Sequence, residues 1–281
     1  MNTPSPGLRA TRSPAGDGGL RLVAGMAGMA GGLADLLRLL GHDGPGVEGV
    51  DDIHVPIRRV HEGETLFHAG SRADAIYFVR AGTFKTFSTA EDGYEQVLGF
   101  AGRGEVLGFD AICMGHYPNE ALALEDSSVY VLLLRDYFEL GERVPALDRL
   151  VLRAVSAALA RRGELADVMA AVAAEVRLAR FLMHLSERMA ASGQSPRRFH
   201  LRMGRRDIAS YLGVAHETVS RSFGALVGLG LLRVDNREVE IVDMAALKNF
   251  ACGTRRTLDD GGRMRGPHPA TAPPQIGVLQ A

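Results

Sequence analysis

Three polar side chains near the C-terminal end have the types and spacing needed to contact DNA bases. Glu217, Ser220 and Arg221 lie three and four positions apart, so a helix places them on one face. Arginine donates two parallel hydrogen bonds to guanine, glutamate accepts one from the cytosine amino group, and serine bonds to a base or a phosphate. The competing interpretation is that all three are solvated polar residues of an exposed helix. The surrounding sequence favours DNA contact.

A helix-turn-helix pattern over residues 205–221 is expected to position these side chains. Small Ala209 lets the two helices approach, Gly213 ends the first helix in the left-handed conformation, and Val219 anchors the second. The predicted DNA-contacting residues are Glu217, Ser220, Arg221, His216, Thr218, Arg205 and Arg206.

Two short strands are expected after the helix-turn-helix, at Leu231–Val234 and Val239–Val242. They would form a hairpin wing, an element that often touches DNA phosphates. The formal net charge of the whole chain is −1, so any basic surface must be local. From Pro196 to Phe250 there are nine basic and six acidic residues, a balance of +3. This local excess fits a nucleic-acid partner.

Catalysis is not expected from this sequence. It contains no Gly-x-Ser-x-Gly elbow, no phosphate-binding Gly-Lys-Ser/Thr loop and no His-Glu-x-x-His zinc site. We therefore predict no catalytic residues and no enzyme activity.

The cysteine content points to a reducing cytoplasm and to no metal site. Cys113 and Cys252 are too few for a disulfide framework or a closed zinc or iron–sulfur site. Residues 20–40 resemble a weak signal peptide, but four glycines dilute this segment, and Asp35 and Arg38 interrupt it. We expect a cytoplasmic protein without a membrane partner.

Glycine punctuation between His54 and Leu134 predicts a compact set of strands and turns, which we interpret as an antiparallel β-roll. Its expected strands include residues 75–80, 84–89, 96–100 and 129–134. The predicted fold class is α+β: a β-roll, a long dimerisation helix and a winged helix-turn-helix. The expected divisions are a flexible segment at 1–50, a β-roll sensor domain at 51–140, a dimerisation helix at 141–175, a DNA-binding domain at 176–250 and a disordered tail at 251–281.

A long helix after Pro145 is indicated by apolar residues at 147, 151, 154, 158, 165, 168 and 172. Since no other element of the chain is expected to cover this whole stripe, we predict that it pairs with its copy in a homodimer. Arg161 and Arg162 lie beside this seam. Either their like charges weaken the pairing, or both side chains extend into solvent.

These motifs together resemble the Crp/Fnr family of bacterial transcriptional regulators, and within it the Fnr branch. The resemblance implies a cyclic-nucleotide-binding-like β-roll, a dimerisation helix and a winged helix, in agreement with the fold class expected above. The resemblance covers residues 55–247, and its sensor part is carried by 63–70, 76–82, 95–100 and 104–112. It implies a Glu-x-x-Ser-Arg signature that reads a TTGAT half-site, matched by Glu217, Ser220 and Arg221, and a target similar to TTGAT-N4-ATCAA. His216 departs from the small apolar residue expected before the signature, which affects preference at the outer base.

The resemblance also suggests effectors, which the residues argue against. Where cyclic-AMP-binding members have an Arg-Ser pair, this chain has Asn119 and Glu120, and a carboxylate would repel a cyclic phosphate. Oxygen-sensing members hold a [4Fe–4S] cluster with three N-terminal cysteines, but residues 1–50 contain none. We expect no cofactor, and an activity that is constitutive or controlled by protein abundance.

Two further alternatives involve histidines. Cys113 and His116 are spaced so that both might reach a haem iron, which would make the protein a ligand-dependent sensor; the simpler interpretation is a core cysteine and a surface histidine. His54, His61 and His68 recur every seven residues, but an odd spacing does not keep them on one face of a strand. The loop at residues 90–94 is a candidate contact for RNA polymerase, as comparable loops are in the family.

Overall fold

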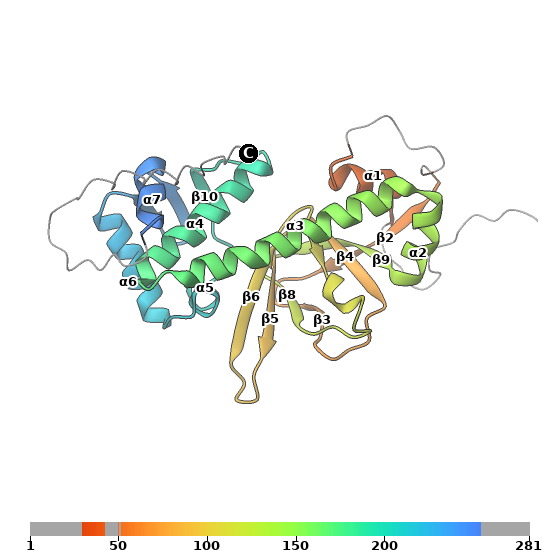
Figure 1. Ribbon diagram of the computed structural model, residues 1–281, viewed down its shortest axis with the longest axis horizontal. Coiled ribbons are helices and arrows are strands. Elements are labelled where there is room, and N and C mark those ends of the chain that lie inside the picture. Colours follow the sequence, from red (N-terminus) through yellow and green to blue (C-terminus); the bar gives the residue numbers. More distant parts are fainter. Residues whose placement is uncertain (1–29, 43–49, 51, 254–281) are drawn as a thin grey trace, which may run out of the picture.

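The computed structural model describes residues 30–42, 50 and 52–253. A single long helix, α3 (Pro145–Ala170), connects a β-rich domain to a smaller domain built mainly of helices (Figure 1). Its 26 residues give it a length of about 39 Å. Pro145 occupies the first turn, where its missing N–H costs nothing. The predicted α+β fold, with a cyclic-nucleotide-binding-like β-roll and a C-terminal winged helix-turn-helix, is confirmed.

The β-roll consists of two sheets that face each other. Their inner faces bury apolar side chains such as Val60 and Val79 from one sheet and Phe84 from the other. In spatial order, the first sheet contains β1 (Ala30–Gly32), β2 (His54–Val60), β9 (Ser127–Leu133), β4 (Ala75–Ala81) and β7 (Val106–Leu107). The second contains β3 (Thr65–Phe67), β8 (Glu120–Ala123), β5 (Phe84–Thr89) and β6 (Glu95–Ala101). The four strands expected from the sequence are present as β4, β5, β6 and β9, the last ending one residue early.

Helices cover the outer face of the first sheet. They are α1 (Leu33–Leu39), α2 (Leu134–Arg143) and the first half of α3. A short 3-10 turn, η1 (Phe109–Ala111), follows β7. After a break at residues 171–173 the chain continues as α4 (Ala174–Ala191), so the predicted dimerisation-helix range 141–175 contains the end of α2, all of α3 and the start of α4.

The C-terminal domain is a winged helix-turn-helix packed on α4. It comprises β10 (Arg198–His200), α5 (Arg205–Leu212), α6 (His216–Gly228), β11 (Leu232–Asp235), β12 (Glu238–Ile241) and α7 (Met244–Ala251). The strands form one sheet in the order β10-β12-β11. The predicted wing strands correspond to β11 and β12, and β10 was not anticipated. No helix in the described part of the chain is long and apolar enough to cross a membrane.

The prediction of a flexible segment at 1–50 is wrong for residues 30–42. Strand β1 pairs antiparallel with β2, and Leu33 donates its backbone N–H to the carbonyl of Ile53 at 2.8 Å. Leu33, Leu36 and Leu37 are at most 1% exposed and pack between the β-roll and α3. A leucine-rich turn of helix buries enough apolar surface to outweigh its ordering entropy. Residues 1–29, 43–49 and 254–281, including most of the predicted tail, lie outside the described residues.

The predicted dimer seam was also placed on the wrong face of α3. Leu147, Val151 and Val168, which belong to that stripe, are at most 3% exposed because the chain's own domains cover them. The apolar side chains that α3 does expose lie on another face, with Leu152 67% and Leu159 63% exposed. Helical periodicity shows that a stripe exists, but not which neighbour covers it.

Shortening a buried leucine of α1 tests whether this helix belongs to the core. Leu36→Ala should lower the free energy of unfolding by about 2–4 kcal/mol, since it removes a fully buried side chain and leaves a cavity. Arg38→Ala, two residues away with a 68% exposed side chain, should change it by less than about 0.5 kcal/mol. Chemical denaturation followed by circular dichroism measures both. Equal stability of the Leu36 variant and the wild type would place α1 outside the core.

Candidate nucleic-acid interface

Helices α5 and α6 form the helix-turn-helix that the sequence predicted. Gly213 ends α5 with φ 62° and ψ 42°, a left-handed conformation that glycine adopts at little cost. A Cβ atom there would lie 2.8 Å from Cε of Met169, the end of a flexible side chain that could shift, so it is the left-handed conformation that favours glycine. In α6, Val219 and Phe223 are buried against α4 and α5, while Glu217 lies on the solvent side.

The base-contact triad, our name for Glu217, Ser220 and Arg221, is exposed on one face of α6. Arg221 Nη2 donates to Oγ1 of Thr218 at 3.1 Å, and Glu217 Oε1 lies 3.2 Å from Nδ1 of His216. The backbone N–H of Glu217 itself, and then the His216 side chain, lower the pKa of the Glu217 carboxyl. Glu217 is therefore a charged acceptor at neutral pH. His216 and Thr218 contact the triad and hold two of its side chains.

Arg205 and Arg206, both predicted to contact DNA, have different surroundings. Arg206 is exposed at the start of α5. Arg205 is only partly exposed: its guanidinium lies 3.5 Å from the centroid of the Phe223 ring, and Nη2 donates to the carbonyl of Asn236 at 3.2 Å. Burial lowers the pKa of Arg205, and its buried Nη1 has no hydrogen-bond partner among the described residues. The side chain thus joins α5, α6 and the wing.

The wing turns through Asn236 and Arg237 between paired residues Asp235 and Glu238. Asn236 has φ 53°, a left-handed conformation that asparagine tolerates better than most residues. At the base of the wing, Arg198 and Arg233 both bind the Glu240 carboxylate, at 2.8 and 3.0 Å. The hydrogen bond from Arg198 is the main cause of the lowered pKa of Glu240. The wing is therefore cross-linked by ion pairs.

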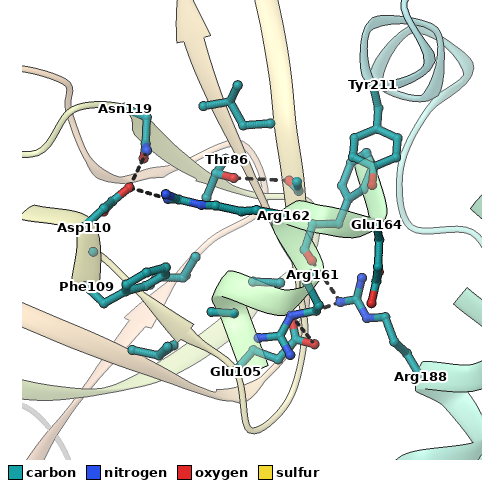
Figure 2. Close-up of a pocket in the computed structure, with 18 residues that line it drawn as sticks. Thr86, Glu105, Phe109, Asp110, Asn119, Arg161, Arg162, Glu164, Arg188 and Tyr211 are labelled. Atoms are coloured by element: carbon teal, nitrogen blue, oxygen red, sulfur yellow. Dashed lines mark hydrogen bonds and ion pairs between the residues drawn. The ribbon is translucent and has the colours of Figure 1, made fainter. Parts of the chain in front are cut away.

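A small cavity of about 90 Å³ lies between the β-roll, α3 and the C-terminal domain (Figure 2). Charged residues from α3 and α4 point into it and pair with acids of the β-roll (Figure 2). Arg162 binds Asp110 at 2.7 Å and lies 5.0 Å from the centroid of Phe109. Arg161 and Arg188 both bind Glu105, at 3.5 and 2.9 Å.

These pairs give each arginine on the long helix an acidic partner within its own chain. Arg161 is 22% exposed, whereas the Arg162 side chain binds Asp110 and is still 51% exposed. The argument from Glu120 is corrected. Its carboxylate binds His68 at 3.1 Å and Thr89 at 3.3 Å, outside the cavity, and the acid that lines the cavity beside Asn119 is Asp110.

The remaining histidines and Cys113 do not gather into a cluster. Cys113 is exposed, not in the core, with Sγ 3.6 Å from the carbonyl of Asp110, and His116 is exposed beside the carbonyl of Met114. His54 and His61 contact Asp52 and Asp126, two unrelated partners, as the odd spacing predicted. Within the described residues, no three His, Cys, Asp or Glu side chains are grouped so as to hold a metal ion.

Comparison with known proteins places these two domains in one family. Residues 176–250 match the Crp-like helix-turn-helix domain, and residues 57–143 match the cyclic nucleotide-binding domain. FixK2 from Bradyrhizobium japonicum shares the fold, with a TM-score of 0.63 at 23% identity over 72% of this chain and all of that one. CooA from Carboxydothermus hydrogenoformans, in a mutant form, aligns with a TM-score of 0.58 at 20% identity over 70% and 88% of the two chains.

Sequence relatives are more similar than these structures. The transcriptional regulatory protein btr of Bordetella pertussis is 38% identical over 204 residues, which cover 73% of this chain and 84% of that protein. The fumarate and nitrate reduction regulatory protein of Escherichia coli strain K12 is 36% identical over 209 residues, covering 74% and 84%. Both are regulators of transcription and not enzymes. With both domains matched and these relatives covered almost end to end, the chain belongs to the Crp/Fnr family of DNA-binding transcriptional regulators.

Proposed function

We propose that this regulator binds a palindromic DNA site similar to TTGAT-N4-ATCAA as a homodimer. The observation that carries the proposal is the two-sided helix α6: Val219 and Phe223 are buried on one side, and the base-contact triad is exposed on the other. The N-terminal half of such a helix enters the major groove in this motif. The triad lies in the first two turns of α6, where it can reach base edges.

The triad offers the hydrogen-bonding groups that such a site requires. Arg221, held by Thr218, can donate two bonds to O6 and N7 of guanine, and the charged Glu217 can accept from a cytosine amino group. Ser220 has both a donor and an acceptor for a base or phosphate. Arg206 and the wing residue Arg237 are exposed beside α6 and are our candidates for phosphate contacts.

Dimerisation is proposed through the face of α3 that the chain leaves exposed. Along it, steps of four and three residues connect Leu152, Ser156, Leu159, Gly163, Ala166 and Ala170. This is the spacing of a coiled-coil seam, and its small residues would let two helices approach closely. A second copy of the chain fits this face because the seam is self-complementary around a two-fold axis, as a palindromic site requires.

We also propose that DNA binding needs neither a cyclic nucleotide nor an iron–sulfur cluster. Arg161, Arg162 and Arg188, the three arginines of the cavity, already bind Glu105 or Asp110, and none is free for a cyclic phosphate. The cavity of about 90 Å³ is also far below the roughly 300–1,000 Å³ typical of small-molecule pockets. With two cysteines in the sequence, one chain cannot provide the four thiolates of a cluster.

Contact with RNA polymerase is proposed through the tip of the β5–β6 hairpin. Its loop, residues 90–94, is exposed and is closed by a backbone hydrogen bond between Ala90 and Tyr94. Tyr94 is 51% exposed, an amphipathic side chain suited to a protein interface. Such a regulator would act in the cytoplasm, where its DNA is.

The base-contact triad is tested first by Arg221→Ala. Loss of one bidentate contact in each half-site should cost about 2 kcal/mol or more, equivalent to at least about thirtyfold in affinity for TTGAT-N4-ATCAA. An aerobic gel-shift titration at fixed salt measures it, with a duplex scrambled in both half-sites as reference. Arg72→Ala, which changes an exposed arginine of the β-roll, should bind as the wild type does.

One result of this titration would contradict the proposal, and an absorption spectrum would then show which part of it fails. Equal binding of the wild type to both duplexes would reject either the proposed site or binding without an effector. The colour of the purified protein distinguishes the two: a colourless protein would point to a wrong site, and a coloured one to a missing or inactive ligand state. An ultraviolet–visible spectrum with a haem or cluster band would favour the ligand-dependent alternative at Cys113 and His116.

The dimer face is tested by Leu159→Asp, which places a charge at the centre of the proposed seam. It should convert the dimer to a monomer in light scattering, because burying an unpaired carboxylate against its own copy is strongly unfavourable. Ala157→Asp is the matched control: this residue is exposed on the same helix, about a third of a turn from the seam. A Leu159 variant that remains dimeric would place the interface elsewhere.

Arg205 is expected to position the wing instead of contacting phosphate. Arg205→Lys keeps the positive charge but loses the flat stack on Phe223 and the hydrogen bond to Asn236. We expect it to weaken specific DNA binding by about tenfold, with an unchanged dependence on salt. Arg206→Lys should bind nearly as tightly as the wild type. If the Arg205 variant behaves like the Arg206 variant, charge alone explains Arg205.

A further inference from the structure

The outer edge of strand β6 is bound by a side chain of the helix-turn-helix. In the sheet order β3-β8-β5-β6, strand β6 has a single strand neighbour, β5. On its other edge, Oγ of Ser210 in α5 accepts the Val97 N–H at 2.8 Å and donates to the Glu95 carbonyl at 2.7 Å. One hydroxyl thus takes the place of a neighbouring strand at two backbone groups that would otherwise be unpaired.

A third hydrogen bond at this edge is donated by a side chain of the strand to the helix backbone. Nε2 of Gln96 donates to the backbone carbonyl of Ser210 at 2.8 Å. Ser210 lies in the last turn of α5, and its carbonyl also accepts the backbone N–H of Gly213 at 3.2 Å. The strand therefore adds a second hydrogen bond to a carbonyl at the C-terminal end of the first helix of the helix-turn-helix.

An ion pair holds the other end of α5 to the same hairpin. Nζ of Lys85 in β5 binds Glu95 at 2.7 Å and Asp207 at 3.1 Å, and the lysine side chain is 11% exposed. Burial alone would lower the pKa of Lys85, but the bonds to Glu95 and Asp207 outweigh it and raise the pKa. The Asp207 carboxylate also accepts the Gly204 N–H at the start of α5.

Apolar contacts complete the docking. The Phe100 ring of β6 lies 5.4 Å from the ring of Tyr211 and 6.1 Å from that of Phe181, measured between centroids. Phe87 and Val97 of the same hairpin are buried in the core of the C-terminal domain. The β5–β6 hairpin therefore contributes to the core of the DNA-binding domain, and Figure 1 shows α5 beside this hairpin.

From these contacts we infer that Ser210 is a positioning residue for DNA binding: by docking α5 on the free edge of β6 it fixes the orientation of the base-contact triad relative to the β-roll. Helix α5 packs directly on α6, so the position of α5 sets that of the triad. The inference rests on the proposed palindromic site. Two triads must be about 34 Å apart to enter successive major grooves, whereas one half-site sets no such distance.

This role predicts a pattern that a merely structural hydroxyl would not give. Ser210→Ala should weaken binding to the palindrome by about tenfold, since two buried backbone groups lose their partner in each chain. Binding to a duplex with a single half-site should change by less than about twofold. If the hydroxyl served only the fold of the DNA-binding domain, both duplexes would lose affinity equally.

A variant on the other side of the contact separates docking from folding. Lys85→Met lies in the β-roll and removes the bond to Asp207 without changing the DNA-binding domain. Like Ser210→Ala, this variant should lose affinity for the palindrome but not for the single half-site. Ser222→Ala is the matched control, because this buried serine of the same domain has a hydroxyl with no hydrogen-bond partner among the described residues. It should leave both affinities unchanged.

Calorimetry of the full-length protein without DNA keeps the inference testable if the palindrome is wrong. The wild type should unfold in one transition across both domains, and the Ser210 and Lys85 variants should show two. Failure of the proposed site alone would appear as equal binding to palindromic and scrambled DNA, with this calorimetric pattern intact. Two independent transitions in the wild type, or an equal loss on both duplexes in the Ser210 variant, would overturn the docking role.

Discussion

The arrangement of the molecule depends on the buried face of helix α3. Leu147 and Val151 near its start pack against the β-roll, and Val168 near its end packs in the core of the DNA-binding domain. One rigid helix of 26 residues thus belongs to two cores, and a rotation about its axis would expose apolar side chains in both. This constraint fixes which face of α3 remains exposed, and it is on this face that we propose that a second copy binds.

Local patterns were sufficient to predict the parts of the fold whose structure is set by nearby residues. The helix-turn-helix follows from a short apolar periodicity and from Gly213, whose left-handed conformation stops α5. Strands such as β4 and β5 follow from apolar runs between glycines. The candidate contacts on α6 were likewise accessible, since spacing alone puts Glu217, Ser220 and Arg221 on one face.

Contacts between distant segments could not be predicted in the same way. Ser210 looks like any polar residue of an amphipathic helix, and its partner strand lies more than one hundred residues earlier in the chain. The sequence does not show the acidic partners of Arg161 and Arg162, because Glu105 and Asp110 belong to distant turns of the β-roll. The sequence shows a basic residue at position 205, but it does not show that this side chain stacks on the Phe223 ring. Charge and spacing identify such residues, and only the tertiary fold selects their partners.

The paired cavity and the docked helix have a common consequence for control of this regulator. Arg162 joins α3 to the β-roll through Asp110, and Ser210 joins α5 to β6, so side chains of the chain itself hold the β-roll against both the long helix and the DNA-binding domain. A ligand can shift such an equilibrium only by as much as it binds one arrangement better than the other. To act through the cavity it must first displace ion pairs that are partly shielded from water. An arrangement held by its own side chains therefore supports our proposal that this regulator binds DNA without a bound small molecule.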